Sequence, residues 1–99
     1  MLTIRKNIGN GKAVFALEGM LDTLTAPEME KELRDSIDGV TELTWDFEKL
    51  EYISSAGLRV LLAAQKLMNR QGSMKVTNVN RSVMEIFEIT GFSEVLTIG

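Results

Sequence analysis

The chain has 99 residues, of which 25% are charged and 44% hydrophobic, and its formal net charge is -3. This length fits one domain, so we assign residues 1–99 to a single folded unit. The sequence contains no cysteine and no histidine, which excludes thiol catalysis, imidazole general bases and the usual zinc sites. A small hydrolase or transferase would therefore have to work from carboxylates, lysines and hydroxyls alone, and we expect no metal and no cofactor. The acidic balance, with 11 scattered basic residues, also argues against a nucleic-acid partner.

The apolar runs of the sequence are all short. None approaches the roughly 20 residues that a membrane span requires. The segment from Met1 to Arg5 alternates in polarity and lacks the apolar block of a signal peptide. We expect a cytoplasmic monomer that does not insert into a membrane.

The first residues predict a β-hairpin. Residues 2–8 alternate in polarity, and residues 12–18 are apolar enough for a buried strand. Between them, Gly9-Asn10-Gly11 is typical of a turn. Residues 19–24 are expected to form a loop.

A helix and a strand follow the hairpin. Thr25 and Glu28 have the spacing of a capping box that opens a helix, and Gly39 ends it. Its expected buried stripe repeats every four residues: Met29, Leu33 and Ile37. Residues 43–47 are rich in strand formers, and a polar turn then separates them from the apolar pair Tyr52-Ile53.

The second half predicts a long helix that begins between Ser55 and Leu58 and runs to about residue 69, where Gln71-Gly72 stops it, and a strand at 74–79. The buried side of this helix is expected to hold Leu58, Leu61, Leu62, Gln65 and Met68. Asn80 or Ser82 then caps a short helix that ends at Gly91 and buries Val83, Ile86 and Phe87. Residues 95–98 are expected to form a last edge strand.

These elements have the order β-β-α-β-α-β-α-β. Helices alternate with strands after the hairpin, and such crossovers join parallel strands. The sequence therefore predicts an α/β domain with one mixed sheet of four to five strands and helices packed mainly on one face.

The segment Ser54-Ser55-Ala56-Gly57 places two hydroxyl groups where a strand becomes a helix. Free N–H groups and the positive dipole at a helix N-terminus stabilise a negative group, so a serine there can carry a phosphate at low electrostatic cost. Gly57 lets a partner backbone approach closely. Helix capping is the simpler explanation of one serine, because Ser is among the commonest N-cap residues. It leaves the second serine unexplained.

A catalytic serine is a weaker hypothesis for the same segment. No histidine is available as a base, and the G-x-S-x-G elbow is absent. Only a Ser-Lys dyad with Lys49 or Lys66 remains formally open.

The whole chain resembles the STAS domains, and specifically the stand-alone anti-sigma factor antagonists of bacteria. Each matching piece is modest, but the set is specific in order and spacing. The pieces are Gly19-Met20-Leu21-Asp22, Thr25-Ala26-Pro27-Glu28, Asp46-Phe47, Tyr52-Ile53-Ser54-Ser55-Ala56-Gly57-Leu58, and Ile86-Phe87 followed by Gly91-Phe92.

The resemblance implies a switchable binding protein and not an enzyme. In such proteins the unphosphorylated antagonist binds an anti-sigma factor, which is also a serine kinase of the histidine-kinase-like ATPase fold, and thereby frees the sigma factor. The kinase phosphorylates a Ser or Thr at the strand-to-helix turn, and binding is lost. A metal-dependent serine phosphatase then restores binding.

The sequence departs from the family pattern at the switch itself. Ser54 stands where the family has Asp, and Ala56 stands where many relatives carry the phosphorylated hydroxyl. Relatives with Ser-Ala-Gly use the serine two residues before the glycine. The resemblance therefore implies phosphorylation of Ser55, with Ser54 as the alternative. A constitutive binder that has lost phosphorylation also stays open.

The resemblance implies a partner-binding surface around this turn, formed by Met20, Asp22, Thr23, Ser54, Ala56, Gly57 and Arg59. Met20 is expected to lie in a loop beside Asp22. Asp22 matches an acidic position near the phosphorylation site, although a loop aspartate also commonly binds turn amides. Arg59 either contacts partner or phosphate or is a solvated helix side chain. Asp46 ends the predicted strand near the same edge, where a structural role is the simpler interpretation.

Two other functions stay open. One is a STAS protein of a different circuit, such as a non-phosphorylated scaffold or an accessory subunit of lipid transport. The other is a small enzyme or nucleotide-binding protein, although the chain has no G-x-x-x-x-G-K-S/T loop. Phosphorylation by a kinase would favour the antagonist, whereas nucleotide binding by the isolated chain would favour the enzyme.

Overall fold

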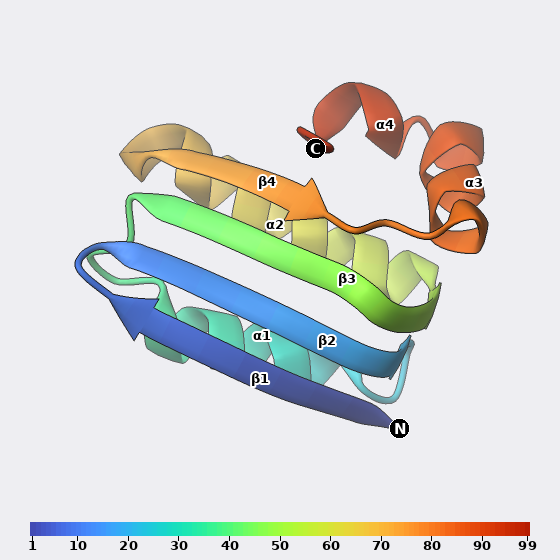
Figure 1. The fold of residues 1–99 in the computed structure, drawn as a ribbon, viewed down its shortest axis with the longest axis horizontal. Coiled ribbons are helices and arrows are strands. Elements are labelled where there is room, and N and C mark those ends of the chain that lie inside the picture. Colours follow the sequence, from blue (N-terminus) through green and yellow to red (C-terminus); the bar gives the residue numbers. More distant parts are fainter.

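A four-stranded mixed sheet organises the structure (Figure 1), a computed structural model that describes residues 1–99. The strands lie in the spatial order β1-β2-β3-β4; β1 is antiparallel to β2, and β3 and β4 continue the sheet in parallel. The elements are β1 (Leu2–Gly9), β2 (Lys12–Leu21), α1 (Ala26–Ser36), β3 (Glu42–Ile53), α2 (Ser55–Gln71), β4 (Ser73–Thr77), α3 (Arg81–Thr90) and α4 (Phe92–Val95). The predicted α/β class and mixed sheet are confirmed.

The β1–β2 hairpin closes through Asn10 and Gly11, whose φ angles of 53° and 75° are the positive values that a type I′ turn requires. The predicted loop at 19–24 is partly wrong, because β2 continues to Leu21. Gly19 permits this continuation, since a Cβ at this position would lie 2.4 Å from the Met1 carbonyl oxygen. The loop is therefore confined to the residues between Leu21 and α1.

β3 is one strand of 12 residues, so the predicted polar turn before Tyr52 is wrong. The register along β2 moves from Ala16↔Asp46 to Glu18↔Lys49, which leaves one extra residue in β3. This β-bulge exposes Glu48 and Lys49 in succession while the strand continues. Two adjacent polar residues within a strand gave the sequence pattern of a turn.

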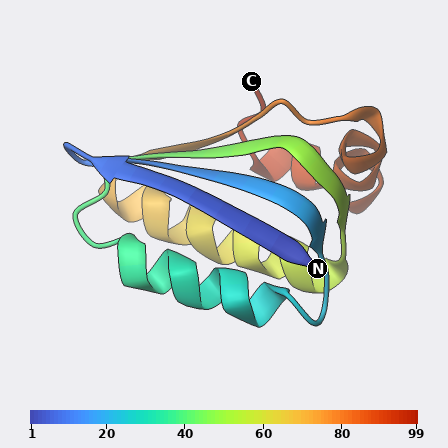
Figure 2. The ribbon, with the colours of Figure 1, turned by 60° about the horizontal axis from the view of Figure 1, so that its bottom comes forward.

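Helices α1 and α2 cover one face of the sheet, and the other face carries no helix (Figures 1 and 2). The covered face holds the core, in which four aromatic rings form a chain: Phe15, Trp45, Phe47 and Phe87, with successive centroids 5.3, 6.1 and 6.5 Å apart. All four side chains are fully buried. Such neighbouring aromatic pairs add about 0.5–1.5 kcal/mol each beyond their burial.

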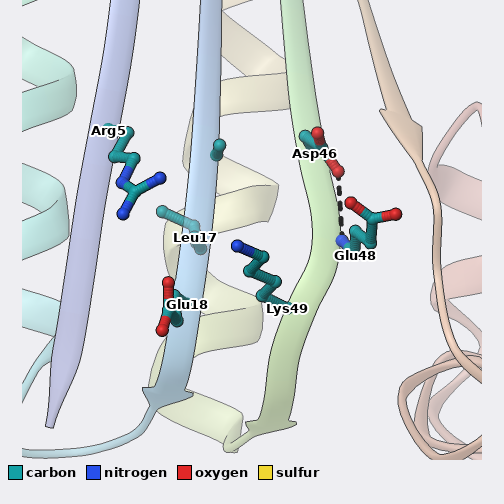
Figure 3. A pocket seen from close by; sticks show the side chains of 7 residues that line it. Arg5, Leu17, Glu18, Asp46, Glu48 and Lys49 are labelled. Carbon is teal, nitrogen blue, oxygen red and sulfur yellow. Dashed lines mark hydrogen bonds between the residues drawn. The ribbon is translucent and has the colours of Figure 1, made fainter.

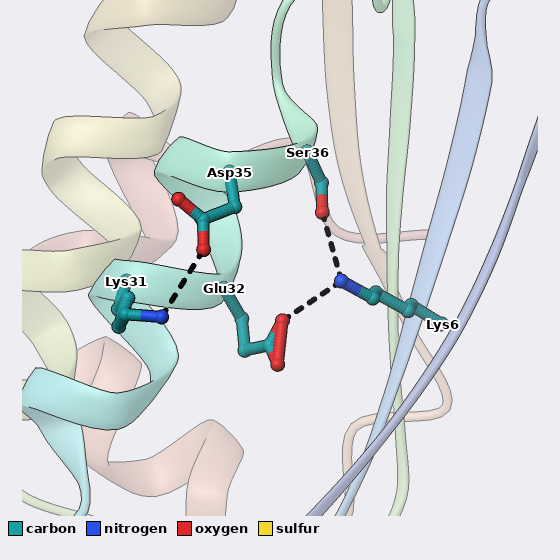
Figure 4. Close-up of polar contacts among 5 residues, drawn as sticks. All are labelled: Lys6, Lys31, Glu32, Asp35 and Ser36. Carbon is teal, nitrogen blue, oxygen red and sulfur yellow. Dashed lines mark hydrogen bonds and ion pairs between the residues drawn. The ribbon is translucent and has the colours of Figure 1, made fainter.

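The hairpin is tied to α1 by Lys6, whose Nζ donates to Glu32 Oε2 at 2.8 Å and to Ser36 Oγ at 3.2 Å (Figure 4). The helix ends at Ser36 with Ile37 as its C-cap, before the predicted Gly39. The predicted capping box at its start is wrong. Thr25 occupies the N-cap position but has helical φ and ψ, so its hydroxyl does not face the first turn.

Helix α2 begins at Ser55, within the predicted range for its start, and runs for 17 residues. Its buried side includes most of the predicted residues, but Leu62 is only half-buried. The predicted cap of α3 is confirmed, because Asn80 Oδ1 accepts from Val83 N at 2.9 Å, and Gly91 ends α3 with φ 82°. No helix of the structure has both the length and the apolar character needed to cross a membrane.

The predicted last strand at 95–98 is wrong. Phe92–Val95 form the short helix α4, and only a parallel bridge between Val76 and Ile98 remains of the strand. Val76 N donates to the Thr97 carbonyl at 2.8 Å, and Gly99 N donates to the Val76 carbonyl at 2.9 Å. This single bridge satisfies part of the outer edge of β4 without extending the sheet.

Candidate functional site

The candidate site lies where β2 and β3 end side by side. The two strands are parallel, and Leu21 pairs with Ile53 at their carboxyl ends. Ser54 N donates to the Leu21 carbonyl at 2.9 Å, which joins the start of α2 to the end of β2. The loop after β2 and the first turn of α2 therefore form one surface, as expected for the carboxyl edge of parallel strands.

The two adjacent serines have different environments. Ser54 is half-buried in extended conformation, and its Oγ caps α2 by accepting from Gly57 N at 3.4 Å. Ser55 is the first helical residue; its side chain is exposed and its hydroxyl has no hydrogen bond within the chain. Only Ser55 thus combines an accessible hydroxyl with the free N–H groups of a helix N-terminus.

Gly57 is buried on the inner side of this turn. A Cβ here would lie 2.7 Å from Ile53 Cγ1, 2.9 Å from Leu21 Cγ and 2.9 Å from the Leu21 carbonyl oxygen. Glycine is therefore needed for α2 to pack on the strand ends. The expected role in the approach of a partner backbone finds no support in this geometry, since the position faces the core.

Asp22 organises the neighbouring loop. Its Oδ1 accepts from Leu24 N at 3.0 Å, from Thr25 N at 3.1 Å and from the Thr25 hydroxyl at 3.2 Å. These bonds, that from Thr25 N first, lower the pKa of the Asp22 carboxyl below its ordinary value of 3.8, although partial desolvation opposes them. Asp22 Oδ1 thus binds the amides of the turn, which is the structural role that the sequence suggested as the alternative to a role near the phosphorylation site.

The Thr25 hydroxyl also stabilises this loop through hydrogen bonds. Its Oγ1 accepts from Asp22 N at 2.9 Å, and its single O–H hydrogen is shared between the Met20 carbonyl at 2.8 Å and Asp22 Oδ1 at 3.2 Å. The hydroxyl therefore bridges the end of β2 to the start of α1, which is what it does in place of the expected capping box.

Met20 lies in β2 and not in a loop as predicted, but its side chain is 39% exposed. Its register partner in β3 is Tyr52, which is 43% exposed. Tyr52 is not among the partner-binding residues expected from the sequence. The feature that could have indicated it is an aromatic residue directly before the buried Ile53 at the end of a strand. The two side chains form a small exposed apolar patch beside the candidate turn.

Arg59 is exposed and makes no ion pair within the chain. With Thr23 and Ala56 it lines a shallow cavity of about 330 Å³ between the first turns of α1 and α2. Ala56 is half-buried against the core. The structure thus brings most of the predicted partner-binding residues to one surface, while Gly57 lies beneath it.

Neither lysine is placed for a Ser-Lys dyad. Lys66 follows Ser55 by 11 residues along α2, which at the helical rise separates their backbones by about 16 Å. Lys49 lies along β3 at about the same distance from Ser54. Asp46 is also remote: it occupies the middle of β3 and not its end, and its Oδ1 accepts from Glu48 N and Asn78 Nδ2, each at 3.0 Å.

A mixed four-stranded sheet, two helices on one face and an exposed serine at the β3–α2 turn characterise this small α/β domain. The chain belongs to the STAS domain family, whose sequence profile matches residues 2–99. BtrV of Bordetella bronchiseptica, a candidate anti-sigma factor antagonist, is 36% identical over 91 residues, which cover 90% of this chain and 78% of BtrV.

Two solved structures show the same fold. An anti-sigma factor antagonist from Mycobacterium paratuberculosis superimposes with a TM-score of 0.88 at 21% identity, covering 99% of this chain and 85% of that one. The Bacillus cell fate determinant SpoIIAA in its phosphorylated form superimposes with a TM-score of 0.76 at 19% identity. The match covers 98% of this chain and 91% of the SpoIIAA chain. The resemblance identified from the sequence motifs is thereby confirmed at the level of family and fold.

Proposed function

We propose that the protein is an anti-sigma factor antagonist that phosphorylation of Ser55 switches off. In its unphosphorylated form it binds an anti-sigma factor serine kinase of the histidine-kinase-like ATPase fold in the cytoplasm and frees the sigma factor. A metal-dependent serine phosphatase resets it. The observation that carries the proposal is the exposed, unpartnered Ser55 hydroxyl at the first position of a 17-residue helix.

The choice of Ser55 over Ser54 follows from their hydrogen bonds. A kinase must reach the hydroxyl and align it with the γ-phosphate of ATP. Ser54 would first have to give up its bond from Gly57 N and leave a half-buried position. Ser55 needs neither change, so its modification leaves the packing of α2 on the strand ends intact.

The name of the relative BtrV supports the class of partner. The partner surface we propose consists of Met20, Asp22, Thr23, Ser54, Ala56 and Arg59 around Ser55, with Tyr52 added by the structure. Gly57 contributes by allowing α2 to sit close to β2 and β3. Together these residues offer the partner a small apolar patch, the Asp22 carboxylate and the Arg59 guanidinium group.

The switch works through charge. A phosphate adds roughly -1.5 to -2 charges at pH 7. In the free protein the N-terminus of α2 and solvent stabilise that charge. In the complex the phosphate would lose hydration inside the interface, which also contains the Asp22 carboxylate. Desolvation and repulsion therefore weaken partner binding far more than they affect folding.

The test uses the anti-sigma kinases of the source organism, each incubated with this protein and ATP. Intact-mass analysis of the wild type, Ser55→Ala and Ser54→Ala should show one added phosphoryl group in the first and third only. Calorimetry should show that Ser55→Ala keeps kinase binding, whereas Ser55→Asp loses about tenfold in affinity, or roughly 1.4 kcal/mol.

Two results would contradict this proposal. Equal kinase affinity of phosphorylated and unphosphorylated wild type would exclude the switch. Phosphorylation of Ser55→Ala but not of Ser54→Ala would keep the switch and move it to Ser54.

A further inference from the structure

The uncovered face of the sheet contains a hollow that the serine switch does not use. Residues of neighbouring strands meet there in rows fixed by the register: Arg5 lies beside Ala16, which lies beside Asp46. The methyl group of Ala16 is much smaller than its two neighbours. Together with the flanking side chains it forms a cavity of about 180 Å³ (Figure 3).

Two cationic side chains point into this hollow from opposite sides. In Figure 3 the Arg5 guanidinium extends from β1 toward β2, and the Lys49 ammonium extends from β3 toward β2. Lys49 reaches the hollow because of the β3 bulge, where β2 advances two residues while β3 advances three. A regular strand would direct only one of Glu48 and Lys49 to this face.

Neither cation has an ion-pair partner. The four ion pairs of the chain use Lys6, Lys12, Lys31 and Arg34 instead. Three carboxylates line the hollow, and two of them turn away from its centre (Figure 3): Asp46 accepts from Glu48 N and Asn78 Nδ2, and Glu48 points toward β4. The third, Glu18, is the register partner of Lys49 and yet lies beyond ion-pair distance.

The hollow therefore contains two cationic groups without ion-pair partners, on either side of the small side chain of Ala16. We propose that it accepts the carboxylate of an aspartate or glutamate side chain from a partner protein docked on the open face of the sheet. An arginine and a lysine that converge suit a carboxylate, because charge-assisted hydrogen bonds are about twice as strong as neutral ones. The hollow does not include Ser55 and does not depend on the proposed switch, but it borders the Met20–Tyr52 pair that also belongs to the partner surface around Ser55.

The size and the surroundings favour a protein side chain over a free small molecule. Sites for drug-sized ligands occupy about 300–1,000 Å³, whereas this hollow has about 180 Å³, enough for one acidic side chain. Met20 follows Glu18 by two residues on the same face, and Tyr52 pairs with it. These side chains, 39% and 43% exposed, offer apolar contact to a partner whose carboxylate enters the hollow.

The test is a titration of the ¹⁵N-labelled full chain with the peptide acetyl-Glu-Gly-Leu-amide, followed by NMR. The peptide should shift the Arg5 Nε–H signal and the amides of Ala16, Leu17 and Lys49 with a saturable curve. The isosteric peptide acetyl-Gln-Gly-Leu-amide should bind about tenfold more weakly, because it lacks the charge. Sodium acetate, which has the carboxylate alone, should also bind more weakly than the glutamate peptide.

Variants of the chain sharpen this test. Arg5→Gln and Lys49→Gln should each reduce the affinity for the glutamate peptide several-fold, whereas Glu18→Gln should raise it, because the nearest competing carboxylate is gone. Lys75→Gln is the matched control, since Lys75 is an exposed cation on β4 outside the hollow, and its removal should leave the affinity unchanged. Unchanged shifts elsewhere in each spectrum verify that the variant is folded.

Three outcomes would overturn the proposal. One is the absence of saturable shifts at the hollow. Another is an equal loss of affinity in Lys75→Gln and Lys49→Gln, which would indicate only unspecific attraction. The third is tighter binding of inorganic phosphate than of the glutamate peptide, which would make the hollow a site for free anions.

Discussion

The two sides of α2 show opposite constraints. Toward the sheet, Gly57, Leu61 and Met68 are buried among the strand side chains. Toward solvent, Ser55 and Arg59 are exposed and make no hydrogen bond or ion pair within the chain. The fold therefore restricts the inner residues strongly and the outer ones hardly at all. Outer residues with no structural partner are the ones whose chemistry is available to another protein.

The largest effect is expected at the centre of the inner side. Leu61→Ala should destabilise the protein by about 2–5 kcal/mol, because Leu61 is fully buried and its removal leaves a cavity. Leu62 is only half-buried, so Leu62→Ala should cost about 1 kcal/mol. Urea unfolding followed by the fluorescence of Trp45, the single tryptophan, measures both. Equal costs would mean that the inner side of α2 is assigned wrongly.

A smaller effect is expected where α2 touches the strand ends. Gly57→Ala should destabilise the protein by about 1–3 kcal/mol, because the new Cβ collides with Leu21 and Ile53. Helix propensity alone would favour alanine by about 1 kcal/mol. The control is Ala63→Gly on the exposed side of α2, which should destabilise by that propensity difference. A Gly57→Ala variant more stable than the wild type would contradict the close packing of this turn.

The contrast between local and long-range determinants also explains what the sequence could predict. The hairpin turn and the Asn80 cap were predictable, because a few neighbouring residues determine each of them. The exposed Ser55 lay in a motif that the family resemblance had already identified. In these cases the local pattern and the final fold agree.

The errors arose where distant residues decide the structure. The β3 bulge at Glu48 and Lys49 depends on pairing with β2, so locally it looks like a turn. The C-terminal residues 95–98 have a strand-like sequence, but Val95 ends α4 and only Ile98 bridges to β4. The hollow between Arg5 and Lys49 requires the register of three strands, which no spacing in the sequence reveals.

The loop beside the outer side of α2 should respond to pH. Hydrogen bonds from Thr25 and Leu24 lower the pKa of Asp22 in the folded state, so the ionised carboxylate contributes stability above its unfolded value of 3.8. That contribution is lost as the pH falls through 3.8 and further toward the folded-state pKa. Asp22→Asn keeps an acceptor oxygen but does not titrate.

Thermal unfolding of both proteins between pH 7 and pH 2.5 measures this difference. The wild type should lose more stability than Asp22→Asn over the acidic part of the range. Parallel stability curves would show that Asp22 makes no net contribution through its charge, and its place in the loop would then rest on the amide contacts alone.

The smallest effects separate the two serines. Ser54→Ala removes the Oγ that accepts from Gly57 N, and at 3.4 Å this bond is long, so the cost should lie near the low end of the range of about 0.5–2 kcal/mol for N-caps. Ser55→Ala removes an exposed hydroxyl without a partner and should change stability by no more than about 0.5 kcal/mol. Ser55→Asp should be neutral or slightly stabilising, because an acidic residue in the first turn complements the helix dipole. Urea unfolding of the three variants, measured together, gives the order. If Ser55→Ala costs more stability than Ser54→Ala, the Ser55 side chain makes contacts that stabilise the fold. A structural role would then explain Ser55, and the turn would have no serine whose hydroxyl is free for a kinase.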